Sequence, residues 1–181
     1  MAKRKLYECY SCGERKPYQQ MTGKKRIRRR TRGECLECRR KRDASNRRLW
    51  DMRFRTKQAG AFMFLTREQL TELEARTNCA YCGEEFNTTI TGHKQIDHVM
   101  PLGEGITARG NLTAACSSCN AGKHNRHVLD YYARSDKFTD ELLDALIADL
   151  AAQNQCTPKS MRGLLESSRE LMSERRAAEC T

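Results

Sequence analysis

Three segments in the middle of the chain are the most informative about its structure: IDHVMPLGEG at residues 96–105, GNL at residues 110–112 and CSSCNAGK at residues 116–123. These stretches place an acid beside a histidine, an asparagine after a glycine, and a second asparagine directly after a Cys-x-x-Cys pair. A carboxylate, an imidazole that titrates near neutral pH and a pair of thiols are residue types that bind metals and move protons. We therefore expect the chemistry of the chain to be concentrated here.

Cysteine spacing indicates two metal sites. Eight of the ten cysteines form four Cys-x-x-Cys pairs, and two such pairs can surround one tetrahedral ion. Disulfides are the alternative, but the basic N-terminus is not followed by the apolar segment of a secretory signal, which favours zinc. A thioredoxin-like redox motif would need a single pair near a βαβ pattern. We predict one structural zinc ion on each of two cysteine sets: Cys9, Cys12, Cys35 and Cys38, and Cys79, Cys82, Cys116 and Cys119.

Composition excludes several classes of protein. Only 38% of the 181 residues are hydrophobic and 7% are aromatic, which is too little for one large core and favours small zinc-stabilised modules. No apolar run approaches the roughly 18 residues that cross a bilayer. We therefore expect a cytoplasmic protein with no membrane partner, and neither an integral membrane protein nor an exported enzyme.

Positive charge is concentrated in the first third of the chain. Residues 1–57 contain 21 Lys or Arg and 6 Asp or Glu, a formal charge of +15, whereas the remaining residues carry −4. This basic region could be a solvated tail. We favour the interpretation that it is a phosphate-binding surface held in place by the first cysteine set. The candidate DNA contacts in this region are Lys24, Lys25, Arg26, Arg28, Arg29, Arg30, Arg32, Arg39, Arg40, Lys41, Arg42, Arg47 and Arg48.

Patterning predicts three regions, at residues 1–58, 62–130 and 136–181. The first is a zinc module with a basic helix over residues 40–58. Its apolar side is expected to include Leu49, Trp50, Met52 and Phe54, which we expect to pack rather than to stack on bases. A capping box at Thr66 predicts a helix to about residue 76. The third region has two helices, starting after Thr139 and near Pro158, whose apolar stripes suit packing, a dimer or a protein partner.

The ordered set of Asp97-His98, Asn111-Leu112, and Cys116-x-x-Cys119-Asn120 with Lys123 resembles the HNH endonuclease family over about residues 79–127. The resemblance implies an α+β fold with a ββα-metal core and flanking helices. The cysteine pairs and basic helix that precede this core are similar, more loosely, to phage-borne HNH proteins.

The resemblance also implies catalytic roles. Asp97 would bind a catalytic Mg²⁺ or Mn²⁺, and His98 would be the general base that activates water. Asn111 would hold the loop that carries the base, and Asn120 would be the second ligand where the family often has His. His124 or His127 would replace Asn120 in a shifted register. Lys123 and Arg126 are expected to contact phosphates, and His93 is expected to be ordinary surface.

The leading functional hypothesis is a metal-dependent endonuclease that acts on double-stranded DNA. Asp97-His98 has a simpler interpretation as a buried salt-linked pair or as a support for the zinc site. The two asparagines have a simpler interpretation as turn or helix-cap residues. Two functional alternatives remain: a zinc-containing nucleic-acid adaptor without activity, and a phage packaging nuclease that cuts only with a partner.

Overall fold

The chain is an α+β protein with two compact units, Met1–Asp51 and Met52–Thr181. The structure is a computed structural model that describes residues 5–22, 32–103 and 105–179. The division falls inside helix α2 (Leu36–Gln58), and the last turns of that helix belong to the second unit. Thr56, on these turns, is buried and hydrogen-bonds to Thr107.

The first unit is a small sheet beside the first cysteine set. Strands β1 (Leu6–Cys9), β2 (Arg15–Pro17) and β3 (Arg32–Gly33) are ordered β2-β1-β3, with β1 antiparallel to β2 and parallel to β3. A 3-10 helix, η1 (Tyr18–Gln20), follows β2. The buried core contains few apolar side chains, so two of the cysteines are part of it, as expected for a metal-stabilised module. Its members are Tyr7, Cys9, Met21 and Cys35.

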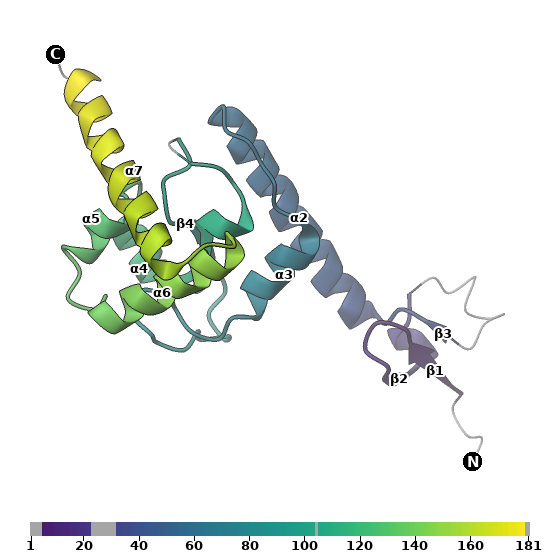
Figure 1. Cartoon of the computed structure of the whole chain (residues 1–181). Helices are drawn as coiled ribbons and strands as arrows, with labels where there is room; N and C mark the ends of the chain where they lie inside the picture. The colour runs from purple at the N-terminus through teal and green to yellow at the C-terminus, as the bar shows by residue number, and fades with distance from the viewer. Residues whose placement is uncertain (1–4, 23–31, 104, 180–181) are drawn as a thin grey trace. The chain divides into compact units, whose positions relative to one another are not determined.

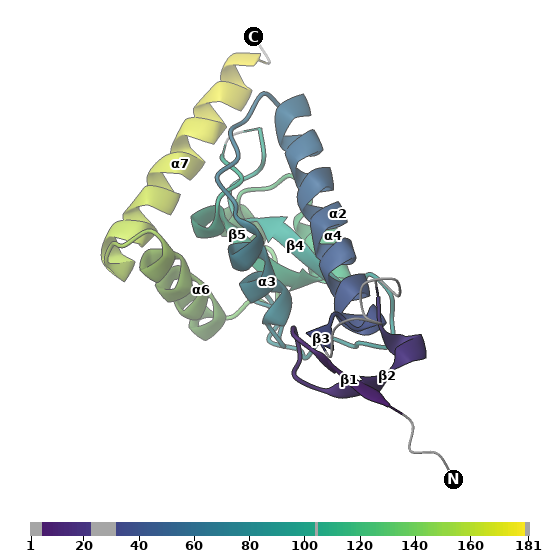
Figure 2. The same ribbon diagram turned by 90° about the vertical axis from the view of Figure 1, so that its right-hand side faces the viewer.

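The second unit is built around a two-stranded sheet and the helix that follows it. Strands β4 (Lys94–His98) and β5 (Leu112–Cys116) are antiparallel, with His98 opposite Leu112. A 3-10 turn, η2 (Arg109–Asn111), leads into β5, and helix α4 (Ser117–Lys123) leaves it directly. This strand, loop, strand, helix order is the ββα arrangement that the sequence predicts, and it lies at the centre of the unit in Figure 2.

Helix starts in the second unit follow the predicted capping signals. Thr66 and Gln69 form a complete capping box at the start of α3 (Arg67–Ala75). Thr139 accepts a hydrogen bond from the backbone of Leu142 and caps α6 (Asp140–Gln153). The last helix, α7, is Pro158–Glu179, and a short helix, α5 (Val128–Tyr132), links α4 to this helical part (Figure 1).

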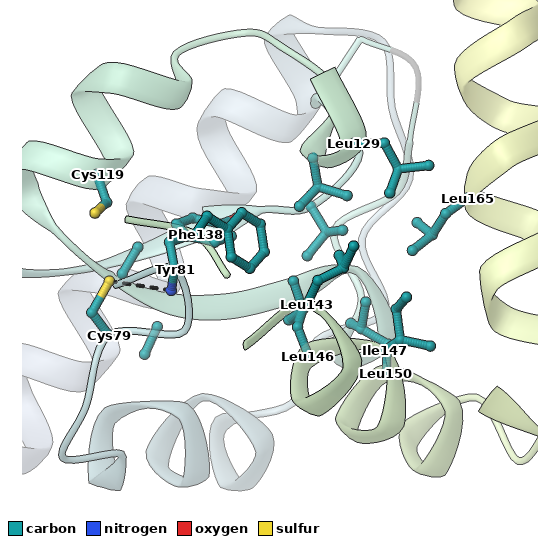
Figure 3. Close-up of a cluster of buried hydrophobic side chains, with 14 of the residues drawn as sticks. Cys79, Tyr81, Cys119, Leu129, Phe138, Leu143, Leu146, Ile147, Leu150 and Leu165 are labelled. Carbon is teal, nitrogen blue, oxygen red and sulfur yellow. Dashed lines mark hydrogen bonds between the residues drawn. The ribbon is translucent and has the colours of Figure 1, made fainter. Parts of the chain in front are cut away.

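Helices α6 and α7 complete the core of the second unit. Leu143, Leu146 and Leu150 of α6 and Leu165 of α7 belong to the same buried cluster as Tyr81 beside the second cysteine set (Figure 3). The region predicted over residues 136–181 is therefore helical but shares its core with the preceding region. Most of its apolar stripe is used for this packing.

The aromatic residues of α2 correct a prediction. Leu49 is buried, but Trp50 is 63% exposed and Phe54 is 52% exposed, so these rings do not form the apolar side that we expected. Residues advance by about 100° around a helix, so Trp50 and Phe54, four positions apart, share a face that Leu49 does not.

Within the part of the chain that the structure describes, no helix is long and apolar enough to cross a membrane.

Candidate active site

The second cysteine set joins the two ends of the ββα arrangement. The thiols of Cys79, Cys82, Cys116 and Cys119 lie within 4.8 Å of one another and could hold one metal ion. The turn that carries the first pair is closed by the amide of Gly83, which donates to the carbonyl of Cys79 at 2.9 Å. Gly83 has a φ of 71°, a conformation that favours glycine.

Hydrogen bonds to sulfur prepare these thiols for a metal. Cys79 Sγ accepts the amide of Cys116 at 3.2 Å. It also accepts the amide of Tyr81 at 3.4 Å, the bond drawn as a dashed line in Figure 3. Burial raises the pKa of Cys116, but the Ser118 hydroxyl and the Cys119 amide outweigh it and lower that pKa to about 7. Thiolates are the form that binds zinc, so these donors favour the ligand state of Cys116, whereas burial raises the pKa of Cys82 to about 11 and also raises that of Cys119.

The first cysteine set is constructed in the same way. Cys9, Cys12, Cys35 and Cys38 also lie within 4.8 Å of one another. The Gly13 amide donates to the Cys9 carbonyl at 2.8 Å, and the Cys35 amide donates to Cys9 Sγ at 3.3 Å, which matches the bonds at Cys79. Burial raises the pKa of Cys9, and amides of Cys35, Cys12 and Ser11 reverse this and lower it to about 6. In both sets the second pair begins a helix, α2 or α4.

Asp97 lies in a buried ion pair between β4 and α4. Its Oδ2 accepts the Tyr81 hydroxyl at 2.6 Å and lies 3.1 Å from Lys123 Nζ. Burial raises the pKa of Asp97, and the Lys123 ammonium and the Tyr81 hydroxyl partly oppose that effect. Lys123 is 1% exposed and also donates to the His98 carbonyl at 2.6 Å. The prediction that Lys123 contacts phosphates is therefore not met, because its ammonium is used inside the site.

Asn120 faces the same interface. Its side-chain amide donates to the side-chain oxygen of Gln95, two residues before Asp97 on β4. Gln95 and Asp97 share one face of β4, because alternate residues of a strand point the same way. Asn120 and Lys123 share one face of α4, because they are three residues apart. Asn120 therefore contacts Gln95 next to the contact of Lys123 with Asp97. The two proposed metal ligands, Asp97 and Asn120, thus reach the same layer between β4 and α4.

His98 points to the other side of β4. Its Nε2 lies 2.9 Å from the hydroxyl of Thr107, which is fully buried. Burial, followed by the nearby charges of Lys123 and Arg55, lowers the pKa of His98 to about 4. The imidazole is therefore neutral at physiological pH, the state in which it can accept a proton.

Asn111 ties the loop between the strands into a fixed shape. It is 2% exposed, and its side chain accepts the Met100 amide at 2.8 Å and donates to the carbonyls of Met100 and Ile106, both at 3.0 Å. A Cβ on Gly105 would lie 2.7 Å from Asn111 Nδ2, so this close approach needs glycine. The loop that Asn111 clamps is the one that presents Thr107 to His98.

The remaining histidines lie outside this interface. His127 is buried, and its ring accepts the Leu129 amide at 3.2 Å and contacts Ser168 at 2.8 Å. It caps helix α5, so it does not substitute for Asn120 as a ligand. His124 is exposed at the end of α4, and His93 is half-buried, packs on Phe86 and accepts the Asn87 amide.

Basic residues of α2 are mostly at the surface. Arg39, Arg40, Lys41, Arg47 and Arg48 are exposed, and Arg42 is half-buried against the carboxylate of Glu34 at 3.0 Å. Arg126 is exposed at the end of α4 and donates to the Gly122 carbonyl. Arg32 lies in β3, and its side chain is outside the described part. The candidates that lie wholly outside the described residues are Lys24, Lys25, Arg26, Arg28, Arg29 and Arg30.

Sequence reasoning missed three residues of this site: Tyr81, Thr107 and Thr56. Tyr81 lies between two predicted zinc ligands, a position that signals burial but not its bond to Asp97. Thr107 and Thr56 meet across 51 residues of sequence, and no local pattern links them.

A family model matches the segment that contains this site. Residues 79–126 match the family model described as HNH endonuclease, and this segment contains both strands, the loop and α4. A nuclease-type function is thereby supported for this segment. The structure is also similar to the crystal structure of the Type II-C Cas9 enzyme from Actinomyces naeslundii, with 20% identity and a TM-score of 0.38. That match covers 75% of this chain and 15% of the Cas9 chain. No curated protein matches the chain.

Proposed function

We propose that this chain is a metal-dependent DNA endonuclease in which His98 activates the water that attacks phosphorus. The observation that carries the proposal is that His98, at the end of β4, and Asp97 and Asn120, in the layer between β4 and α4, all lie within the segment that matches the HNH family model. Phosphodiester hydrolysis needs an activated water, a counter-charge and a stabilised leaving oxygen. These three residues have side chains suited to the first two needs.

His98 supplies the base. Its pKa of about 4 keeps the ring neutral, so one ring nitrogen has a lone pair that can take a proton from water. As the proton moves to the imidazole, the hydroxide that forms attacks in line with the leaving 3′ oxygen. The products would carry a 5′ phosphate and a 3′ hydroxyl.

Asp97 and Asn120 would hold the catalytic ion. A carboxylate and an amide oxygen are hard donors that suit Mg²⁺ or Mn²⁺, and both side chains reach the layer between β4 and α4. The Asp97 carboxylate already lies against one cation, the Lys123 ammonium. When bound, the ion would supply positive charge at the scissile phosphate and the leaving oxygen.

We assign structural roles to the two cysteine sets, each with one zinc ion. Four thiolates leave no open position on the metal, so neither ion would take part in hydrolysis. The second set fixes the start of α4 relative to the turn that carries Tyr81, and thereby positions the ion pair of Asp97.

The substrate that fits this chain best is double-stranded DNA in a bacterial or phage-infected cytoplasm. The exposed arginines of α2 and the positive charge of residues 1–57 suit a phosphate backbone. The exposure of Trp50 and Phe54 favours the reading in which aromatic rings contact bases over the reading in which they form a core.

The test is cleavage of supercoiled plasmid by the purified full-length chain with Mg²⁺ or Mn²⁺, beside an EDTA control. Metal-dependent nicking or linearisation supports the proposal, and the product form separates nicking from double-strand cutting. DNA binding without cleavage would overturn it in favour of the adaptor.

A partner-dependent packaging nuclease is the second candidate, because α7 keeps two leucines at its surface. Leu164 is 52% exposed and Leu171 is 57% exposed, and residues seven apart share a helix face. Cleavage that appears only after a partner protein is added would favour this candidate.

A further inference from the structure

A chain of three hydrogen bonds leads from His98 into helix α2. His98 Nε2 lies 2.9 Å from Thr107 Oγ1, and Thr107 Oγ1 lies 2.6 Å from Thr56 Oγ1. Thr56 Oγ1 in turn lies 2.7 Å from the carbonyl of Met52, one turn earlier in the helix. Thr56 is 2% exposed and Thr107 is fully buried, so bulk water does not compete for these bonds.

Counting protons fixes the direction of every bond in the chain. A carbonyl oxygen only accepts, so the single hydroxyl proton of Thr56 goes to Met52. Thr107 must then donate its own single proton to Thr56, and it has none left for His98. The proton between His98 and Thr107 is therefore on Nε2 of the imidazole. A neutral imidazole has one N–H and one lone pair, so the lone pair of His98 is on Nδ1.

The backbone around Thr107 holds its hydroxyl in place. Its amide donates to the Phe62 carbonyl at 2.9 Å, and its carbonyl accepts the Phe64 amide at 2.8 Å. These bonds form an isolated bridge between Met63 and Thr107. The segment just after α2 thus holds the backbone of Thr107, and Thr56, on the last turns of α2, holds its hydroxyl. We call the hydrogen bonds from His98 through Thr107 and Thr56 to Met52 the relay.

We propose that Thr107 and Thr56 are positioning residues that hold His98 in its Nε2–H tautomer, so that Nδ1 is the atom that takes the proton from water. This inference rests on the proposed function of His98 as the base. A hydroxyl pair orients the ring without adding negative charge beside it, so the neutral form is kept. The role of Thr56 makes the end of α2 part of the active site, although Thr56 itself does not touch the substrate in this mechanism.

The direct test is nitrogen NMR of the full-length protein labelled with ¹⁵N-histidine. The His98 signals are assigned by their loss in His98→Gln. We expect Nε2 to be protonated in the wild type, and we expect Thr107→Val to mix the two tautomers, since valine keeps the shape and removes the hydroxyl. Thr107→Ser should restore the wild-type spectrum. A wild-type ring protonated on Nδ1, or a spectrum unchanged in Thr107→Val, would overturn the proposal.

Thr56→Val tests the far end of the relay. It removes the acceptor of the Thr107 proton, so Thr107 can turn to donate to His98 and shift the ring toward the Nδ1–H form. Thr71→Val is the matched control, because the Thr71 hydroxyl makes the same bond to a carbonyl four residues earlier, at 2.9 Å, on the surface of α3. The expected result is a tautomer shift in Thr56→Val and none in Thr71→Val. Equal spectra for the two variants would contradict the relay.

Cleavage kinetics give the second readout. Thr107→Val and Thr56→Val should each lower kcat roughly 10- to 100-fold, a part of what a positioned base contributes, with KM for plasmid unchanged. Zinc content and circular dichroism identify variants that fail to fold. Loss of kcat with a wild-type tautomer would overturn the relay. A wild type with no cleavage would instead refute the proposed function, and the NMR result would still decide the relay.

Discussion

Lys123 Nζ lies 3.1 Å from Asp97 Oδ2, and both residues are buried, at 1% and 8% exposure. A buried carboxylate without a partner is strongly unfavourable, and the Lys123 ammonium opposes the rise in the pKa of Asp97 that burial causes. The pair also places a carboxylate, already paired with a cation, in the layer where Asn120 projects from α4. The position of Asp97 is thus fixed by a group that the sequence pattern assigned to phosphate binding.

Removing this lysine should destabilise the second unit. Lys123→Met leaves the Asp97 charge buried and unpaired, which should lower the free energy of unfolding by about 3–5 kcal/mol. The double variant Lys123→Met/Asp97→Asn should recover a large part of that loss, because no buried charge remains. Denaturant unfolding of the zinc-loaded protein measures both.

The matched control is Lys137→Met, which removes an exposed ion pair with Glu84 of 3.5 Å. The free energy of unfolding of this variant should be close to that of the wild type. Equal destabilisation by Lys123→Met and Lys137→Met, or no recovery in the double variant, would show that the buried pair does not hold Asp97.

Two zinc ions per chain are expected by native mass spectrometry, one for each cysteine set. Cys9→Ser should remove one ion and unfold the first unit while the second unit stays folded, since the two units have separate cores. Cys116→Ser should remove the other ion and abolish cleavage. Cys156→Ser is the control, because this thiol is exposed and outside both sets. A wild-type chain that keeps its fold and binds no metal would refute the assignment.

The free energy of unfolding should decrease as the pH falls, because His127 is buried in the folded protein and takes up a proton more readily in the unfolded chain. Burial lowers its pKa from 6.5 to about 4, so the unfolded chain binds this proton first as the pH falls. Its contribution is complete above pH 6.5 and is lost between pH 6.5 and 4, at up to about 1.4 kcal/mol per pH unit. His127→Asn keeps a cap acceptor and cannot titrate, so its unfolding curve should be flatter over that range. His124→Asn, at an exposed position, should behave like the wild type; parallel curves for all three proteins would exclude the effect.

Salt dependence of DNA binding tests the α2 surface. Arg47→Gln and Arg48→Gln should weaken binding and reduce the slope of log affinity against log salt by about 0.9 for each phosphate that the variant no longer neutralises. Arg134→Gln, an exposed arginine outside the proposed DNA surface, should leave the slope unchanged. The same measurement on Arg28, Arg29 and Arg30 tests the basic segment outside the described residues. Identical slopes for all variants would mean that these arginines do not touch phosphates.

Local signals in the sequence predicted much of the second unit. The caps at Thr66 and Thr139 start their helices where the side-chain chemistry requires, and cysteine spacing predicted both four-thiol sets. These features depend on residues a few positions apart or on a spacing that metal geometry imposes. Neighbouring sequence is sufficient to specify the caps and each Cys-x-x-Cys pair, and the four-ligand geometry of zinc then joins the pairs.

Features that depend on long-range packing were not predictable in this way. Lysine is usually a surface residue, so the burial of Lys123 is not expected from its type. It is buried because it pairs with Asp97, which is 26 positions earlier and lies across the β4–α4 interface. The relay through Thr107 and Thr56 depends on the end of α2 meeting the loop before β5. Trp50 and Phe54 looked like core because they are apolar, but their shared helix face differs from that of Leu49.

The most direct test of the central claim is His98→Ala beside the wild type, with plasmid cleavage and DNA affinity measured on the same zinc-loaded preparations. His98 is at the end of β4, whereas the exposed arginines proposed to bind DNA belong to α2, so the variant should bind DNA with wild-type affinity and lose cleavage by at least about 100-fold. His124→Ala should cleave normally. Cleavage by His98→Ala at the wild-type rate, or loss of binding equal to the loss of cleavage, would contradict the assignment of His98 as the base.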